Sequence, residues 1–301
     1  MDKSELPHVN FKDEEVTVLS DNNGNSVNVI EYDGYYLSKK AIEKERIADH
    51  RINIPNIIKM HIRPDDVFLV AYPKAGTHWT WEITTMLKQD GKEQNLPKEV
   101  AMLPFETPEK IDELPSPRLI NSHCCFKHLP QEILEKKNKI IFVNRNPKDV
   151  AVSFFHHCQH AVDYKGTFSQ FLDFFMSEKV YHCAWYKYVL DWERVFKQHP
   201  ELQVLYVNYE DLHTDPMRET DRIATFLDVR KSEEFYSKVL EKCSFSELKQ
   251  SYKKRNNMDF MFRKGAVGDW KNWFTVTDNE RFENYLKEKL SNPFVKFTYC
   301  L

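Results

Sequence analysis

A turn that contains a lysine is the first feature of the chain that could do chemistry. Residues 72–79 read YPKAGTHW and follow the apolar run VFLVA at 67–71. A strand ending in such a turn leads into a helix, whose free N–H groups and positive dipole end favour an anion. Lys74 adds a full charge, so the segment predicts a phosphate cradle; a plain strand-to-helix turn with a solvated Lys74 is the alternative. It is not a Walker loop, because two glycines precede the lysine there, whereas Gly76 follows it.

Two other side chains with chemical potential also follow apolar runs. His123 comes after the run at 118–120, and histidine titrates near neutral pH, so it can take a proton from a hydroxyl. Arg145 comes after the run at 140–143, and its planar fork can hold two phosphate oxygens at once. The chain has twelve histidines, and a lone histidine is more often structural.

The elements that must position these groups are short strands alternating with helices. The strand-like runs, rich in Val, Ile, Leu and Phe as buried parallel strands are, lie at 67–71, 118–120, 140–143 and 204–207. Between them, apolar residues recur at helical spacing, as in Trp79, Ile83, Leu87 and in Trp185, Val189, Trp192, Phe196. The alternation predicts an α/β fold with a central parallel sheet flanked by helices. Ligands of such folds bind outside the carboxyl ends of the strands.

Composition agrees with an intracellular protein of one domain, which we expect in the cytoplasm. The 301 residues contain no Pro/Gly/Ser-rich linker, so we expect a single domain over 1–301, with roughly the first 45 residues as a peripheral extension. No signal sequence or membrane span is expected, and the six cysteines lack zinc-like spacing, so we expect reduced thiols and no metal site. The net charge of −3 gives no general attraction for nucleic acid.

Three segments in order give the chain a close resemblance to the cytosolic sulfotransferases, which use 3'-phosphoadenylyl sulfate (PAPS). The YPKAGTHW segment at 72–79 resembles the family's YPKSGTTW, and RNPKDVAVS at 145–153 is identical to its 3'-phosphate segment. MFRKGAVGDWK at 261–271 resembles FMRKGxxGDWK with the first two residues exchanged. The resemblance implies a P-loop-like phosphosulfate-binding loop, PAPS as co-substrate and its desulfated form PAP as product.

The resemblance also implies residues for the donor nucleotide. The loop at 74–79 is expected to wrap the 5'-phosphosulfate, with Lys74 beside the bridging oxygen, where negative charge develops. Arg145, Ser153 and Arg263 match ligands of the 3'-phosphate. The full expected set for the nucleotide is Lys74, Ala75, Gly76, Thr77, His78, Trp79, Arg145, Ser153, Tyr209, Cys243, Phe245, Met261, Phe262, Arg263, Lys264 and Gly265. The aromatic members would supply flat faces for adenine.

Acceptor chemistry is expected at His123, which fills the catalytic-base position of the family segment RLIKTH. With Lys74 stabilising the leaving phosphate, the implied reaction is in-line sulfuryl transfer to a hydroxyl or amine. The resemblance implies an apolar acceptor pocket that includes Phe105, Phe154 and Phe155. Phenols, alcohols, steroids and amines all remain open as acceptors.

One departure from the family pattern bears on activity. Asn121 stands where RLIKTH has a lysine, so the chain lacks a charge expected to hold the sulfonate, and a slower transfer is expected, which Asn121→Lys should raise. A PAPS-binding protein with little or no turnover is therefore the alternative, and a nucleotide kinase of related fold is a third. Lys127 is a candidate to replace the charge in part, and His128 is a less favoured candidate for the base.

A segment near the C-terminus resembles the family's dimer motif KxxxTVxxxE. The specified positions are filled by Lys271, Thr275, Val276 and Glu280. A short self-complementary segment on a two-fold axis would let the lysine of one subunit meet the glutamate of the other, so a homodimer is expected. An ordinary loop before a helix is the alternative.

Overall fold

A five-stranded parallel sheet forms the centre of the computed structural model, which describes residues 11–44, 47–91, 98–256, 259–290 and 297–301. Its strands are β4 (Val67–Ala71), β5 (Met102–Leu103), β6 (Leu119–Ser122), β7 (Lys139–Asn144) and β8 (Val204–Asn208), in the spatial order β5-β6-β4-β7-β8. All neighbouring strands run parallel. The α/β prediction is confirmed, and each of the four predicted runs overlaps a strand. The strand β5 was missed because two residues are too short to show a pattern.

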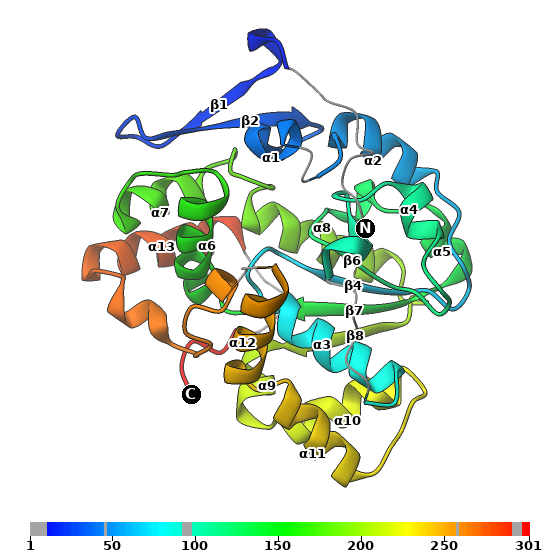
Figure 1. The fold of residues 1–301 in the computed structure, drawn as a ribbon. Coiled ribbons are helices and arrows are strands. Elements are labelled where there is room, and N and C mark those ends of the chain that lie inside the picture. Colours follow the sequence, from blue (N-terminus) through cyan, green and yellow to red (C-terminus); the bar gives the residue numbers. More distant parts are fainter. Residues whose placement is uncertain (1–10, 45–46, 92–97, 257–258, 291–296) are drawn as a thin grey trace.

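Helices cover both sides of this sheet. In Figure 1, α3 crosses in front of the strands and α8 lies behind them. The α-helices of the described residues are α1 (Lys39–Glu43), α2 (His50–Ile58), α3 (Thr77–Lys88), α4 (Pro108–Asp112), α5 (Glu132–Lys136), α6 (Pro147–Ala161), α7 (Phe168–Met176), α8 (Trp185–Gln198), α9 (Tyr209–Thr214), α10 (Pro216–Phe226), α11 (Glu233–Lys242), α12 (Phe245–Asn256) and α13 (Val276–Lys289).

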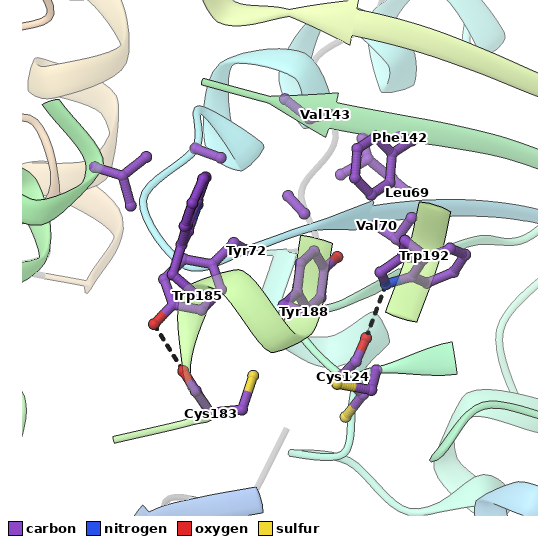
Figure 2. Packing of buried hydrophobic residues seen from close by; sticks show 14 of the residues in the cluster. Leu69, Val70, Tyr72, Cys124, Phe142, Val143, Cys183, Trp185, Tyr188 and Trp192 are labelled. Atoms are coloured by element: carbon purple, nitrogen blue, oxygen red, sulfur yellow. Dashed lines mark hydrogen bonds between the residues drawn. The ribbon is translucent and has the colours of Figure 1, made fainter. Parts of the chain in front are cut away.

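The core between α8 and the sheet is aromatic, and two of its buried polar groups are paired. The predicted face of α8 packs inward, with Trp192 against Phe142 of β7 at a ring distance of 5.8 Å (Figure 2). The Trp192 indole N–H donates to the Cys124 carbonyl at 3.4 Å. The Tyr72 hydroxyl donates to the Cys183 carbonyl at 2.8 Å. Because these two groups are paired, the rings of Trp192 and Tyr72 can be buried at little desolvation cost, whereas the buried Tyr188 hydroxyl has no partner among the described residues.

A second, antiparallel sheet precedes the main body and was not predicted. Its strands are β1 (Thr17–Ser20), β2 (Ser26–Tyr32) and β3 (Tyr35–Ser38). Asp33 and Gly34 join β2 to β3 with positive φ angles of 49° and 79°, as a type I′ hairpin requires. Tyr36 exchanges two backbone hydrogen bonds of 2.8 Å with His182, which fixes this sheet to the main body.

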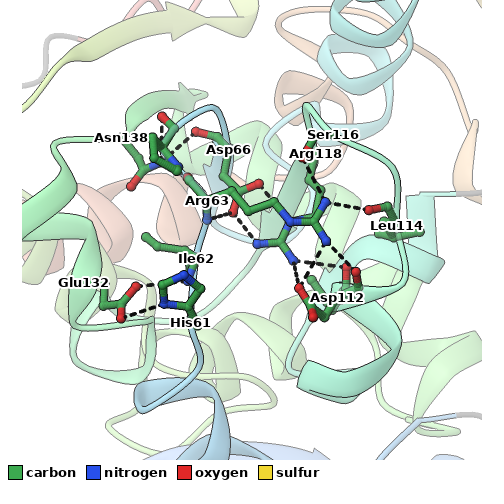
Figure 3. A network of polar contacts seen from close by, with 12 residues as sticks. His61, Ile62, Arg63, Asp66, Asp112, Leu114, Ser116, Arg118, Glu132 and Asn138 are labelled. Atoms are coloured by element: carbon green, nitrogen blue, oxygen red, sulfur yellow. Dashed lines mark hydrogen bonds and ion pairs between the residues drawn. The ribbon is translucent and has the colours of Figure 1, made fainter.

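A buried ion pair holds the start of β4 in place. The Arg118 side chain is fully buried, and its Nε donates to Asp66 at 2.8 Å (Figure 3). The Val67 N–H donates to the Arg118 carbonyl at 2.9 Å, and the Asn138 side-chain amide donates to the Asp66 carbonyl at 3.1 Å. The pair therefore ties β4 to the chain that enters β6 and β7.

Removing one member of this pair should be costly. We expect Asp66→Ala to lower the free energy of unfolding by about 3–5 kcal/mol, because Arg118 would stay buried without its main partner. Urea unfolding measures the loss. The matched control is Asp228→Ala, since Asp228 is 83% exposed and its pair with Lys139 should contribute less than about 1 kcal/mol. Equal losses in both variants would contradict the role given to the buried pair.

Candidate functional site

A cavity of about 1410 Å³ opens at the carboxyl ends of the main strands. Lys74, His123, Arg145 and Tyr209 follow β4, β6, β7 and β8 respectively, and all four line it. The strand β4 lies between β6 and β7, so connections leave it on both sides of the sheet. Such a reversal in strand order leaves a crevice for a ligand, which is the place that the sequence predicted.

The loop after β4 is held in a shape that exposes the start of α3. Lys74 has φ of 71° and Gly76 has φ of 104°, a conformation that favours glycine. A Cβ on Gly76 would lie 2.5 Å from the Tyr209 ring, so space as well as backbone requires glycine there. No side chain caps α3. Its first N–H groups can therefore donate to an anion in the cavity.

Positive charges converge on this loop. Arg145 donates to the Lys74 carbonyl at 3.2 Å and to the Ala266 carbonyl at 3.0 Å, and its guanidinium lies 4.1 Å from the centre of the Tyr209 ring. Burial, assisted by the charges of Arg145 and Lys98, lowers the pKa of Lys74 to about 7. Burial and neighbouring positive charges destabilise the charged form of Lys74, and such a lysine indicates a site that binds an anionic ligand.

The loop after α12 brings two more cations to the cavity. Arg263 and Lys264 line it and both pair with Asp269, whose pKa they lower against the effect of burial. A Cβ on Gly265 would lie 2.2 Å from the Phe245 ring, so the loop passes directly over that aromatic face. Met261 and Phe262 line the same wall.

Flat aromatic faces lie beside the cations. Trp79 and Phe245 line the cavity, and Phe245 is 37% exposed. Trp79 packs edge-on against the rings of Tyr209 at 5.8 Å and His213 at 4.9 Å. Cys243 also lines the cavity and donates its thiol to the Met86 sulfur at 3.7 Å. Such faces suit a nucleobase.

His123 is oriented as a proton acceptor. Its Nδ1 lies 2.7 Å from the Ala71 carbonyl oxygen, which can only accept, so Nδ1 carries the proton and Nε2 is free of one. Burial, with the charges of Lys98 and His182, holds the pKa of His123 well below its usual value. The imidazole is therefore neutral and can accept a proton within the cavity.

Three residues of the predicted site lie in the core instead of the cavity. Ala75 is 2% exposed, Phe154 is fully buried against Tyr72, and Phe155 packs on Trp273 at 5.9 Å. The reason for the two phenylalanines is helical periodicity. The cavity-lining face of α6 carries Ser153, His157, His160 and Ala161, and Phe154 and Phe155 turn away from it. The other predicted nucleotide residues line the cavity, as does Phe105.

Several lining residues were missed by sequence reasoning. Lys98 and Glu99 come from a short helix before β5, and Tyr181 and His182 from the segment between α7 and α8. The N-terminal segment also contributes, through Lys40, Ala41, Lys44 and Ile47. These positions carry no local signal, because only the tertiary fold brings them to the cavity. His156 and His157 were considered as polar residues of the pocket, with exposed helix positions as the favoured interpretation, and the structure puts His157 in the lining.

Lys127 and His128 do not lie in the lining of the cavity. Lys127 pairs with Asp33 at 2.7 Å, and His128 Nε2 lies 3.0 Å from the same carboxylate. Both side chains therefore tie the β2–β3 hairpin to the main body. The suggestion that Lys127 replaces the absent charge is wrong in this structure.

The segment expected at a dimer interface is exposed. Lys271, Thr275, Val276 and Glu280 all reach the surface, with Val276 at 76% exposure. Thr275 also caps α13 by accepting from the Asp278 N–H at 3.1 Å. The predicted homodimer remains a prediction.

The described residues offer neither a metal site nor a membrane span. Within them, no cluster of three or more His, Cys, Asp or Glu side chains could hold a metal ion. In the same part of the chain, no helix combines the length and apolar character needed to cross a membrane.

Comparison with known proteins gives consistent matches. A family model described as the sulfotransferase domain matches residues 64–293. Sulfotransferase 1B1 of the dog is 33% identical, with 81% of this chain and 90% of the dog protein covered. Sulfotransferase 1A1 of the rat is 35% identical over 78% of this chain and 87% of its own. Mouse sulfotransferase SULT7A1, solved with PAP, superposes with a TM-score of 0.73 at 29% identity, covering 88% of this chain and 96% of the mouse chain.

The lowered pKa of Lys74 leads to a prediction about how the folding stability depends on pH. In the unfolded chain a lysine keeps its proton to about pH 10.4, whereas the folded protein releases it near pH 7. Between these values the unfolded state binds more protons, so this group makes the native state more stable as pH rises. We expect Lys74→Met to raise the free energy of unfolding of the ligand-free protein more at pH 7 than at pH 9, by at most about 1.4 kcal/mol per pH unit.

Urea unfolding at the two pH values measures this difference. Lys165→Met is the control, because it removes a lysine that is 73% exposed. A larger gain for Lys74→Met at pH 9 would mean that the folded protein stabilises the ammonium, contrary to the geometry.

Proposed function

The chain belongs to the sulfotransferase family, and from that premise we propose that it moves a sulfuryl group from PAPS to a hydroxyl or amine of a small, largely apolar acceptor. The observation that carries the proposal is that His123, with an unprotonated Nε2, and Lys74 line one cavity at the carboxyl ends of the parallel strands. A base for the acceptor and a cation for the leaving group are the two parts that the reaction needs.

The donor side of the cavity fits a nucleotide with two anionic ends. Within the described part of the chain, the buried Thr77 Oγ1 and Arg145 Nε have no hydrogen-bond partner, as expected of groups that a bound anion would satisfy. We assign the loop at 74–79 to the 5'-phosphosulfate. Arg145, Ser153 and Arg263, extended by Lys264 and Gly265, are assigned to the 3'-phosphate.

The nucleobase is assigned to the aromatic wall. Trp79 and Phe245 would hold the adenine between flat faces, with Tyr209 and Cys243 next to them. The mouse relative, whose structure contains PAP, supports this use of the site.

The chemical step follows from the protonation states. PAPS supplies the activated sulfuryl group when it is bound. Nε2 of His123 takes the proton of the acceptor hydroxyl or amine as that atom attacks. Lys74 is assigned to the leaving phosphate, where a preorganised cation would stabilise the developing charge, and stabilisation that grows toward the transition state raises the rate. No covalent enzyme intermediate is required.

The acceptor side is apolar and lined with neutral rings. Phe105 stacks on His182 at a centroid distance of 6.2 Å, and Tyr181 and His157 lie in the same lining. Burial holds the pKa of both histidines below the usual value, to about 3 in His182. The wall therefore suits an uncharged ring system with a hydroxyl or amine. Phenols, alcohols, steroids and amines all meet this description.

We also propose that the protein works in the cytoplasm and as a homodimer through the segment 271–280. The exposed Val276 and the motif positions around it support the dimer. The alternative to an active enzyme, a nucleotide-binding protein with poor turnover, is favoured by Asn121, which has no charge to offer the sulfonate.

The base assignment is tested by transfer of labelled sulfate from PAPS to a panel of phenols, steroids, alcohols and amines. We expect His123→Ala to lower kcat by about 10²–10⁴-fold, the usual contribution of a general base, with PAP affinity nearly unchanged. His128→Gln is the control, because His128 contacts Asp33 and does not line the cavity. Full activity in His123→Ala, with loss in a folded His128→Gln, would contradict the assignment.

A further inference from the structure

A buried lysine from outside the family motifs reaches the reaction site. Lys98 is 1% exposed and lines the cavity. Its Nζ donates to Asn121 Oδ1 at 3.0 Å and lies 3.5 Å from the Met102 sulfur. Within the described residues, no carboxylate oxygen lies within 4 Å of this ammonium. The lysine is therefore a buried cation with neutral direct partners, and the charge of the neighbouring Glu99 offsets the effect of burial on its pKa only in part.

Asn121 acts as a clamp for this lysine. Its Nδ2 donates to the Lys98 and Ala101 carbonyls, both at 2.9 Å, and these contacts fix which way the amide points. Because carbonyls can only accept, the amide nitrogen must face them and Oδ1 must face the Lys98 ammonium. A lysine at 121 has no acceptor and could not make this arrangement.

Lys98 is placed to act on both halves of the reaction centre. Its charge lowers the pKa of Lys74 on the donor side and of His123 on the acceptor side, in each case after the larger effect of burial. Besides Lys74, the N-terminal half gives the lining Lys40 and Lys44, which are exposed, and Lys110, which lies 4.0 Å from Glu106. Lys98 is thus a second enclosed cation beside Lys74, while those three are not enclosed.

A purely structural role explains Lys98 poorly. Burying an ammonium against an amide oxygen and a thioether costs more than burying an uncharged chain of the same length, and burial already lowers its pKa to about 8. Met102 beside it shows that the surroundings accept an unbranched apolar side chain. A charge kept at such a cost indicates a function that needs it.

We propose that Lys98, held by Asn121, contacts the sulfuryl oxygens during transfer and supplies the charge that the family resemblance places at position 121. The inference rests on the proposed function. Lys98 is then a catalytic residue and Asn121 a positioning residue. The same reasoning reverses the expectation for Asn121→Lys, since a second ammonium beside Lys98 in a dry site is repulsive and should lower the rate.

The test separates the sulfuryl group from the rest of the nucleotide. Binding of PAP and of PAPS, the latter without acceptor, is measured by calorimetry, and kcat is measured with the best acceptor of the panel. Lys98→Met should lower kcat by about 10–100-fold, the range expected for a charge-assisted hydrogen bond, and should weaken PAPS binding several-fold. PAP affinity should change by less than about threefold, and thermal stability should not fall.

Two further variants complete the design. Lys98→Met combined with Asn121→Lys should recover part of the lost rate and PAPS affinity, because the charge is returned to the same place from the other side. Lys127→Met is the matched control, since it removes a lysine that pairs with Asp33 away from the cavity, and both affinities should stay at the wild-type values.

The possible failures are distinguishable. If wild type binds PAP and transfers sulfate but Lys98→Met keeps its rate and its ratio of PAPS to PAP affinity, the role of Lys98 is overturned and the proposed function stands. Equal weakening of PAP and PAPS, with loss of stability, would assign Lys98 a structural role and also overturn the inference. A wild type that binds neither nucleotide would remove the proposed function itself.

Discussion

The parallel pairing of β4 with β6 and β7 is the interaction on which the site depends. Leu69 pairs with Asn121 on one side and with Ile141 on the other, so the loops after these three strands leave the sheet at one level. This register brings the Lys74 loop, His123 and Arg145 to the same crevice. A slip by one residue would turn the side chains of a strand to the opposite face, and the buried pair of Arg118 and Asp66 at the other end of β4 helps to prevent it.

The electrostatics of the cavity follow from what that crevice collects. Cations from separate loops face each other in a partly dry space, and the ligand-free protein bears their repulsion, as the lowered pKa of Lys74 shows. The histidines of the acceptor side stay neutral for the same reason, since burial opposes their charged form. The repulsion lowers the folding stability of the ligand-free protein, and a bound anionic co-substrate would restore it by neutralising these charges. The positive charges of the cavity are therefore complementary to an anionic ligand, whereas they repel one another when the cavity is empty.

Position 121 shows that the sequence motif and the folded structure can differ in where a positive charge is found. In the sequence alone, Asn121 replaces the lysine of the family segment RLIKTH, so a positive charge is lost at this position. In the folded protein its amide holds the ammonium of Lys98, which arrives from another element. The phenylalanines of α6 show the opposite case, in which neighbours in sequence do not share a site. Phe154 and Phe155 follow a motif residue directly and yet face the core. Neighbours along a helix differ by about 100° in direction, so adjacency in sequence does not place two side chains in one pocket.

The sequence by itself determined the fold class, the family and the main loops of the cavity, because each depends on a local pattern: buried strands, a turn before a helix, and contiguous motif residues such as 145–153. It also singled out His123 by its place after a strand. Only the tertiary structure decided the tautomer of His123, through the Ala71 carbonyl, and the contributions of Lys98, His182 and the N-terminal segment to the cavity wall. The physical reason is that these groups meet across long stretches of chain, and such meetings are set by packing and register, which leave no signal in neighbouring residues.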